Sequence, residues 1–318
     1  MYLVTGGEGF IGSNLVAALV RRGVPVAVCD LEGGRYLRDL VLSGRVTAVR
    51  PAQLFAWLDA HAGKIALIFH LAANTLTTET NLRALQETNV DLSSALLSWC
   101  CRTSTRFIYA SSAATYGDGA LGFEDTQEPT KLARLQPLNP YARSKHRFDQ
   151  HVVTCVARDD AMPPQWAGMK FFNVYGRNEA HKLTMRSPIA RGIDDIAIGA
   201  PIRLFRSPVG PELKRDFVYI DDCIDVALWL ADNPNVSGLF NVGTGNARSW
   251  ADVAEALFRE IGTNTGIELV DIPKSLEAQY QYFTQASLTR LREAGYAGGF
   301  MTVEEGIANH LQRLSHRH

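Results

Sequence analysis

Long apolar runs, an excess of charge of one sign and regularly spaced cysteines are all missing from this chain of 318 residues. No stretch reaches the roughly 18 consecutive apolar residues that a membrane-spanning helix needs, so we expect no membrane partner. The formal net charge of -1 leaves no basic field for nucleic acid, which we also exclude as a partner. The length suits one large α/β domain with an appended lobe.

The cysteines are few, and their spacing indicates neither a disulfide framework nor a zinc site. The sequence has no CxxC pair and no cluster of histidines or carboxylates with ligand spacing, so we expect no metal. An odd number of thiols fits a reducing compartment, and the opening "MYLVTGG" has no charged and apolar leader, so we expect a cytoplasmic protein. The five cysteines are Cys29, Cys100, Cys101, Cys155 and Cys223.

The first half of the chain alternates strand-like and helix-like segments. Near-continuous apolar strands in a β-α-β-α alternation predict a Rossmann-type, doubly wound parallel sheet of the α/β class, with helices on both faces. The expected strands are 2–5, 24–30, 45–49, 65–73 and 106–112, and the expected helices are 11–22 and 81–101.

The second half is less regular and predicts a smaller lobe interleaved with the sheet domain. Asn139 followed by proline is a favourable helix start, and turn-rich segments follow from about 177 to 213 and from 243 onward. Further strands are expected at 169–174 and 239–245, and further helices at 221–231 and 249–261. We assign 1–171 plus about 215–242 to an NAD(P)-binding Rossmann domain, and about 172–214 plus 243–318 to a substrate-binding lobe.

A glycine-rich turn follows the first expected strand and opens the first expected helix. In "TGGEGFIGSN" the GxxGxxG spacing permits a tight turn and lets a diphosphate approach the helix N-terminus. The pattern is weak alone, but Asp30 ends the next strand, as a dinucleotide site requires, and this context disfavours a purely structural turn. The expected cofactor contacts in the loop are Gly6, Gly9, Phe10, Ile11 and Gly12.

The choice between the two nicotinamide dinucleotides depends on the residues just after the second strand. Asp30 would hydrogen-bond the adenosine ribose and favour NAD. Arg35 or Arg38 could instead accept a 2′-phosphate and favour NADP, or could be solvated. The residues leave the choice open, and Leu31 joins Asp30 and Arg35 as an expected cofactor contact.

A tyrosine, a lysine and two serines form the candidate catalytic set. Tyr141 and Lys145 are four residues apart on one face of an expected helix, where an ammonium lowers the pKa of a neighbouring phenol. Tyr141 is then a candidate acid/base for a sugar hydroxyl, and Lys145 could also bind the nicotinamide ribose. Ser111 and Ser112 end a strand at the edge where ligands bind in such sheets, and Ser112 could orient the hydroxyl. A surface helix pair would explain the tyrosine and lysine alone, but not all of these features together.

These motifs together resemble the extended short-chain dehydrogenase/reductase superfamily over the whole chain. The glycine loop, "HLAA", the serine pair and YxxxK occur in the order and at the separations of that superfamily. The resemblance implies a nicotinamide-dependent enzyme that acts on a nucleotide sugar. It also implies cofactor contacts at Leu71, Ala72, Ala73 and Asn89.

Within this superfamily, the residues disfavour dehydration and favour epimerisation. Sugar-nucleotide dehydratases carry an Asp-Glu pair just after the serine strand, where this chain has Ala113-Ala114. The second half closely resembles the ADP-glyceromanno-heptose 6-epimerases in "FNVYGRNEAHKLTM", "KRDFVYIDD", "FNVGTGNARSW" and above all "YQYFTQASLTRLREAGY". That family interconverts the D-glycero and L-glycero forms of ADP-manno-heptose, a precursor of the lipopolysaccharide core.

The chemistry of a 6-epimerisation explains why the polar stretch "NVYGRNEAHK" contains a lysine. Carbon 6 of the heptose has no adjacent carbonyl, so the workable route is oxidation by the cofactor to a 6-keto sugar and return of hydride to the other face. Each orientation of the oxygen needs its own acid/base. Tyr141 is the first candidate, and the resemblance implies Lys182 as the second, against the alternative of a solvated loop lysine. His181 is expected to be a hydrogen-bonding neighbour.

The same resemblance implies a substrate site built from the second half. Asn173 would touch the sugar, and Val174 would lie near the nicotinamide. Arg215 would bind the diphosphate, because a planar guanidinium suits phosphate oxygens. Phe205 and Tyr280 would also contact the substrate. The resemblance further implies NADP as the cofactor and a homo-oligomer, which is a pentamer in that family and often a dimer in the wider superfamily.

The chain departs from that family at several substrate contacts, which keeps two alternatives open. Thr184 and Arg191 stand where a serine and a histidine are expected, the 203–213 loop contains two prolines, and Leu71-Ala72-Ala73 replaces an acidic "EGA" segment. One alternative is another nucleotide-sugar epimerase or reductase. The other is a non-catalytic Rossmann cofactor sensor, which the presence of the tyrosine and the lysine disfavours.

Overall fold

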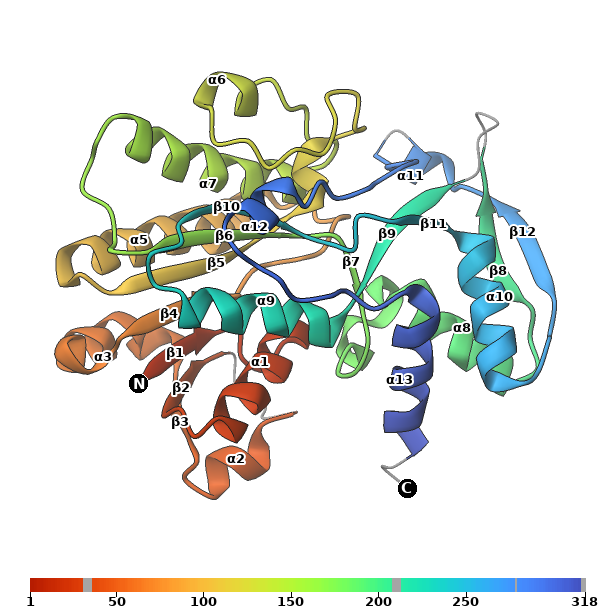
Figure 1. The fold of residues 1–318 in the computed structure, drawn as a ribbon, viewed down its shortest axis with the longest axis horizontal. Coiled ribbons are helices and arrows are strands. Elements are labelled where there is room, and N and C mark those ends of the chain that lie inside the picture. Colours follow the sequence, from red (N-terminus) through yellow and green to blue (C-terminus); the bar gives the residue numbers. More distant parts are fainter. Residues whose placement is uncertain (31–35, 208–212, 278, 316–318) are drawn as a thin grey trace.

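The centre of the molecule is a parallel sheet of seven strands in the order β10-β6-β5-β4-β1-β2-β3. The computed structural model describes residues 1–30, 36–207, 213–277 and 279–315 (Figure 1). The order reverses between β1 and β4, so the predicted doubly wound Rossmann-type sheet is confirmed. The strands are β1 (Tyr2–Thr5), β2 (Val26–Cys29), β3 (Val46–Val49), β4 (Leu67–His70), β5 (Arg106–Ser112), β6 (Trp166–Phe171) and β10 (Gly238–Val242).

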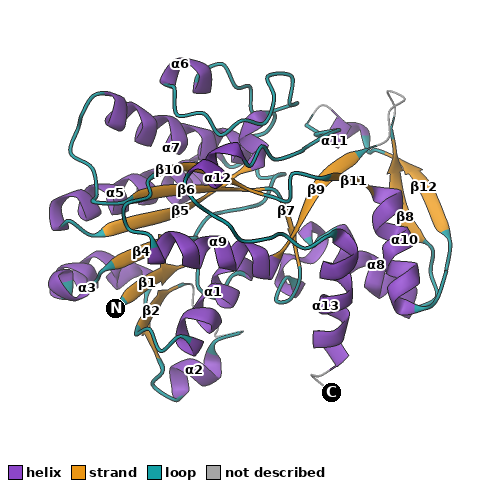
Figure 2. Cartoon of the chain, viewed as in Figure 1, coloured by secondary structure: helices purple, strands orange, loops and turns teal. Residues whose placement is uncertain are grey.

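Helices cover both faces of this sheet, and each face has its own hydrophobic core (Figures 1 and 2). Neighbouring residues of a strand point to opposite faces, so Val4 packs in one core and Leu3 in the other. This explains why the strands read as continuous apolar runs. One core contains α1 (Phe10–Arg21) and α9 (Ile220–Asp232), and the other contains α3 (Leu54–Ala60), α5 (Leu92–Thr103) and α7 (Pro140–Ala157).

Two of these helices carry residues that matter for the site. The expected helix 81–101 is a continuous run formed by α4 (Leu82–Leu85), a π-helical stretch η3 (Gln86–Asp91) and α5. The helix α7 begins as its sequence predicts, because the side chain of Asn139 accepts a hydrogen bond from the Ala142 amide and Pro140 occupies the first turn.

A second layer of structure lies beside the main sheet (Figure 1). It contains a three-stranded sheet in the order β11-β9-β7 and a two-stranded sheet of β12 and β8. Its strands are β7 (Asn173–Tyr175), β8 (Ile202–Arg206), β9 (Lys214–Tyr219), β11 (Ala247–Ser249) and β12 (Ile267–Asp271). Its helices are α8 (Pro188–Ala197), α10 (Trp250–Ile261) and α13 (Val303–Ser315). The lobe boundary that we expected near residue 215 falls inside β9, which pairs with β7 and β11 and not with the main sheet.

Short helices complete the described part of the chain. None of the helices among the described residues has the length and apolar character needed to cross a bilayer. The short segments are α2 (Arg38–Leu42), α6 (Pro129–Leu132), α11 (Lys274–Glu277), α12 (Thr289–Glu293), η1 (Pro51–Gln53), η2 (Ala62–Lys64), η4 (Ala113–Tyr116) and η5 (Ala180–Met185).

Candidate active site

A cavity of about 1640 Å³ lies between the main sheet and the second layer. Thr5, Cys29, Ser112 and Phe171 line it, and each is the last residue of a parallel strand. Ligands of open α/β sheets bind outside the carboxyl ends of the strands, next to the point where the strand order reverses. The cavity therefore lies where a doubly wound sheet binds its cofactor.

Most residues predicted from the sequence line this one cavity. Asn89 is an exception, because its side chain is fully buried in the π-helical stretch and does not reach the cavity. Leu31 and Arg35 lie outside the described residues, and so does the side chain of Thr184. The predicted residues that line the cavity are Gly6, Gly9, Phe10, Ile11, Gly12, Asp30, Leu71, Ala72, Ala73, Ser112, Tyr141, Lys145, Asn173, Val174, Lys182, Arg191, Phe205, Arg215 and Tyr280.

The glycine loop is shaped for close approach of a ligand. Gly6 has φ +72°, and a Cβ atom there would lie 2.6 Å from the backbone nitrogen of Ala72. A Cβ at Gly12 would collide with the carbonyl of Gly6. The N-cap of α1 is Gly9, and no side chain caps this helix end. The amides at the start of α1 are thus available to a diphosphate, and the loop fits a dinucleotide cofactor.

Asp30 lines the cavity beside a second carboxylate, Glu8, that the sequence did not indicate. Asp30 Oδ2 accepts a hydrogen bond from the Glu8 amide at 2.6 Å. In turn, Glu8 Oε2 accepts one from the Tyr36 amide at 2.8 Å. The Tyr36 hydroxyl lies 3.2 Å from Nδ1 of His181, as expected of a hydrogen-bonding histidine. These contacts link the cofactor loop to the neighbour of Lys182.

Ser112 and Tyr141 come together at the junction of β5 and α7. Burial raises the pKa of Tyr141, a hydrogen bond with Ser112 lowers it, and the charge of Asp149 raises it. We expected Lys145 to lower the pKa of this phenol, but burial outweighs any such effect in the protein alone. Burial also lowers the pKa of Lys145 to about 8. Tyr141 and Lys145 therefore lie in a low-dielectric site. The positively charged nicotinamide ring of a bound oxidised cofactor would favour the phenolate form of Tyr141 there.

Asn89 supports the catalytic helix from behind the cavity. Its side-chain nitrogen donates to Ser144 Oγ and to the carbonyl of Asn74, both at 2.9 Å. Its side-chain oxygen accepts from the Asn74 amide at 2.8 Å. These three hydrogen bonds are all made within the protein, so Asn89 positions Ser144, the neighbour of Lys145, and its expected contact with the cofactor stays a prediction.

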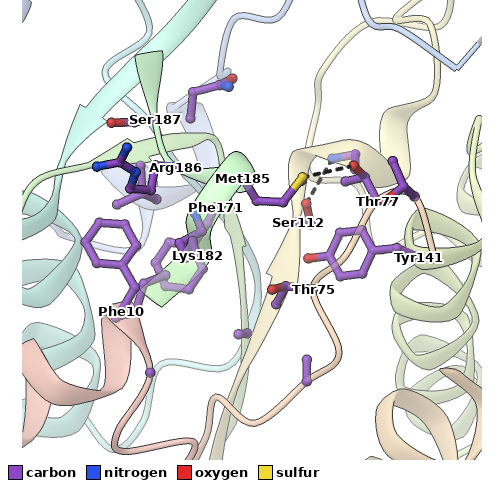
Figure 3. A pocket seen from close by; sticks show the side chains of 18 of the residues that line it. Phe10, Thr75, Thr77, Ser112, Tyr141, Phe171, Lys182, Met185, Arg186 and Ser187 are labelled. Atoms are coloured by element: carbon purple, nitrogen blue, oxygen red, sulfur yellow. Dashed lines mark hydrogen bonds between the residues drawn. The ribbon is translucent and has the colours of Figure 1, made fainter. Parts of the chain in front are cut away.

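Lys182 lies in η5 and faces Phe10 from another side of the cavity (Figure 3). Its Nζ atom is 5.2 Å from the centre of the Phe10 ring, and burial lowers its pKa, which Glu179 partly opposes. The next residue, Leu183, has φ +48°, a conformation that side chains rarely adopt. A lysine with a lowered pKa in a cavity can exchange protons nearer neutral pH than an ordinary lysine can.

The polar groups of "NVYGRNEAHK" hold this irregular segment against α1. Arg177 Nε donates to Asn14 Oδ1 at 2.6 Å, and Asn178 Nδ2 donates to Ser13 Oγ at 3.1 Å. The carboxylate of Glu179 accepts hydrogen bonds from the Gly176 amide within the segment and from the amide and hydroxyl of Ser187 beyond it. The first three residues form β7 and pair with β9, and side-chain hydrogen bonds hold the irregular residues that follow, which explains the polar composition of the stretch.

Three of the predicted substrate residues, Arg215, Phe205 and Tyr280, lie together in the lining of the cavity. The guanidinium of Arg215 lies 5.1 Å from the centre of the Tyr280 ring, and burial lowers its pKa to about 10. Phe205 meets the edge of Tyr280 with ring centroids 5.7 Å apart. A cation and two aromatic faces at one end of a cavity can bind a diphosphate joined to a flat base.

Two further contacts around the cavity were not expected from the sequence. Thr77 donates to the sulfur of Met185 at 3.9 Å, and Met185 lies between Lys182 and Tyr141 in the close view (Figure 3). Gln281 donates to the carbonyl of Gly117 at 2.6 Å and ties the second layer to the turn after β5. Met185 and Gln281 both lie in segments that carry the family resemblance, but the resemblance assigned no contact to either residue, because each contact joins positions that are distant in the chain.

Comparisons with known proteins agree with this geometry. The model of the NAD dependent epimerase/dehydratase family matches residues 2–243. An ADP-L-glycero-D-manno-heptose-6-epimerase of Nitratidesulfovibrio vulgaris is 41% identical over 323 aligned residues, covering 98% of this chain and 97% of the relative. Its namesake from Fusobacterium nucleatum is 34% identical over 335 aligned residues, covering 98% and 97%.

A solved structure shows that the similarity extends to the fold. The ADP-L-glycero-D-manno-heptose-6-epimerase of Helicobacter pylori superposes with a TM-score of 0.80 at 26% identity, covering 99% of this chain and 96% of the other. The cavity at the strand-order reversal, the glycine loop and the full-length similarity lead to one conclusion. The chain belongs to the NAD dependent epimerase/dehydratase family.

Proposed function

We propose that this protein is an ADP-glyceromanno-heptose 6-epimerase, an isomerase that interconverts the D-glycero and L-glycero forms of ADP-manno-heptose. The observation that carries the proposal is the presence of two candidate acid/base groups, Tyr141 and Lys182, on different elements of one cavity. Similarity to relatives of that name over 98% of the chain supports the substrate.

A nicotinamide dinucleotide bound along the glycine loop would accept a hydride from carbon 6 and return it to the opposite face. The protein's own residues handle the proton. In one direction the phenolate of Tyr141 takes the hydroxyl proton, and Ser112 orients the oxygen while a 6-keto sugar forms. After the carbonyl presents its other face, the ammonium of Lys182 returns a proton to the oxygen. In the reverse reaction the two residues exchange roles.

The cofactor is NADP by resemblance, and Arg35 is the candidate contact for its 2′-phosphate. The carboxylates of Asp30 and Glu8 at the ribose end support NAD instead, because a free 2′-hydroxyl can donate to a carboxylate that would repel a phosphate. Denaturing the purified protein and identifying the released dinucleotide by mass distinguishes the two. Weaker binding of NADP, but not of NAD, by Arg35→Ala would support the phosphate contact.

The direct test of the reaction uses the purified protein and ADP-D-glycero-manno-heptose. The two carbon-6 epimers have equal mass, so chromatography must separate them. We expect an equilibrium mixture without added cofactor, because the hydride returns to the sugar and regenerates the cofactor. If the cofactor is bound but no conversion occurs, the departures at Thr184, Arg191 and the 203–213 loop have changed the sugar. The protein would then be another nucleotide-sugar epimerase or reductase.

The resemblance also supports a setting for this activity. It indicates a cytoplasmic homo-oligomer, with a pentamer as the first expectation, that supplies a precursor of the lipopolysaccharide core. All five cysteines are free thiols, which suits a reducing compartment. Light scattering during gel filtration measures the oligomeric state, and a monomer would contradict this part of the proposal.

A further inference from the structure

A buried ion pair that the proposed reaction does not use lies behind the Ser112–Tyr141 side of the cavity. Asp149 lies on α7, one helical turn beyond Lys145, and Lys170 lies on β6. Both side chains have 0% exposure, and Nζ of Lys170 is 2.5 Å from Oδ2 of Asp149. Neither residue lines the cavity. Burying two charges costs solvation free energy, so the pair needs a reason beyond packing.

The pair connects four elements around the proposed catalytic residues: α7, β6, β5 and η4. Tyr109 and Ser111 on β5 donate to the two oxygens of the Asp149 carboxylate, at 3.0 and 2.7 Å. Lys170 donates to Thr115 Oγ1 at 2.8 Å, in the turn η4 that follows β5. Ser111 and Lys170 are also register partners across β5 and β6. One buried network thus fixes the catalytic helix against the strand and turn that carry the serines.

We propose that Asp149 and Lys170 are positioning residues, which hold Tyr141 at Ser112 and keep the local field neutral so that the phenol can exchange its proton. This inference rests on the proposed acid/base role of Tyr141. The carboxylate anchors the helix, and the ammonium offsets the carboxylate's charge. Replacement by an uncharged pair could preserve the packing, but loss of only one charge would change the field at the reacting groups.

The pKa values of Tyr141 and Lys145 both respond to the charge of Asp149. After the larger effect of burial, Asp149 raises the pKa of Tyr141 and also acts to raise that of Lys145. Without Lys170, the carboxylate would act on both groups with no adjacent positive charge. Without Asp149, the remaining ammonium would favour the phenolate. The two single changes therefore have opposite signs.

The other titratable groups around the pair keep one charge state above neutral pH. Burial raises the pKa values of Tyr109 and Tyr116 well above the usual value, so both stay neutral. Burial lowers the pKa of His146 to about 4, with Lys170 lowering and Asp149 raising it, so it is neutral. Burial raises the pKa of Asp125 to about 6, against the effect of Lys170, so it is ionised. Lys182 also titrates above neutral pH, but it lies on another side of the cavity and its pKa responds to burial and to Glu179. A shift produced by changing Asp149 or Lys170 can then be assigned to Tyr141 and Lys145.

The test compares the pH dependence of kcat/KM in Lys170→Met, Asp149→Asn and the double variant. Tyr141 and Asp149 are eight residues apart on α7, which corresponds to a rise of roughly 12 Å along the helix. A unit charge at about that distance shifts the pKa of a group by on the order of one pH unit at an effective dielectric of about 20. We expect Lys170→Met to move the profile up, Asp149→Asn to move it down, and the double variant to restore it. Tyr109→Phe removes a hydrogen bond to the same carboxylate without changing charge, and its profile should not move.

Equal profiles in the two single variants, with only the rates lowered, would overturn the proposal and leave a structural role. If a single variant does not fold, Lys170→Arg and the double variant provide the test. Both should retain the wild-type profile, and a displaced profile in either would overturn the proposal. Failure of the proposed function has a different signature, because the wild-type protein would then leave ADP-D-glycero-manno-heptose unconverted. Failure of the acid/base role alone would appear as normal turnover by Tyr141→Phe.

Discussion

The two proposed acid/base residues lie in surroundings that are built in different ways. Tyr141 occupies the first turn of an 18-residue helix, against the end of a central strand. Lys182 occupies an irregular segment that contains a residue at φ +48° and is held by side-chain contacts to α1. The comparison shows that a regular helix, packed on a strand and tied to it by the buried Asp149–Lys170 network, positions Tyr141, while a few side-chain contacts position Lys182. We expect the Lys182 side to be the more adjustable of the two.

The largest expected effect is the loss of Tyr141. Tyr141→Phe removes the acid/base and the hydrogen bond with Ser112, and positioned proton transfer contributes roughly 10²–10⁴-fold. We expect epimerisation to fall by about that factor while the cofactor remains bound. Chromatographic separation of the epimers measures the loss, and the released dinucleotide serves as the control. Wild-type turnover would contradict the role of Tyr141.

Replacement of Lys182 tests the other side of the comparison. Lys182→Met should also abolish most epimerisation, by roughly 10²-fold or more, yet one of the two epimers should still reduce the bound cofactor through Tyr141. Absorbance of the reduced nicotinamide after mixing with each epimer separately measures this asymmetry. Lys182→Arg keeps the positive charge but does not release a proton, so it should be equally inactive. Full activity in Lys182→Arg would leave the lysine with a binding role only.

The link between the cofactor loop and Lys182 should have a smaller effect. Tyr36→Phe removes the hydroxyl that lies 3.2 Å from His181, and a neutral hydrogen bond is worth about 0.5–1.5 kcal/mol. We expect turnover to fall by about 2- to 10-fold with little change in folding. Tyr2→Phe is the matched control, because its hydroxyl accepts a hydrogen bond from Arg106 away from the cavity. An equal loss in both variants would argue against the link.

The smallest expected effect concerns the backbone beside Lys182. Leu183 is 75% exposed, so its replacement removes little packing. Leu183→Gly should change the free energy of unfolding by less than about 1 kcal/mol, because the relief of strain offsets the added freedom of the unfolded chain. Leu183→Val places a β-branched residue at φ +48° and should destabilise by about 1 kcal/mol or more. Chemical denaturation of both variants measures the difference, and equal stabilities would mean that Leu183 is not strained.

Local patterns predicted one side of the site well. The helix start at Asn139, the serines at the end of β5 and the helical spacing of Tyr141 and Lys145 all follow from short sequence rules. The glycine loop was equally predictable, because its GxxGxxG spacing between a strand and a helix is a short sequence pattern. The structure supplies the reason for Gly6, since a side chain there would collide with the backbone of Ala72. The expected lowering of the Tyr141 pKa by Lys145 was not found, because desolvation of the buried phenol is not visible in spacing.

The sequence by itself determined the α/β fold, the glycine loop and the helical spacing of Tyr141 and Lys145, since strand periodicity and helical spacing are local properties. The candidate role of Lys182 came from the family resemblance. Only the tertiary structure placed Lys182 over Phe10, turned Asn89 inward through a π-helical stretch and paired Asp149 with Lys170. These contacts join residues that are distant in the chain, and they set burial and electric field. Burial and field decide which proton can move, and neither can be read from the order of the residues.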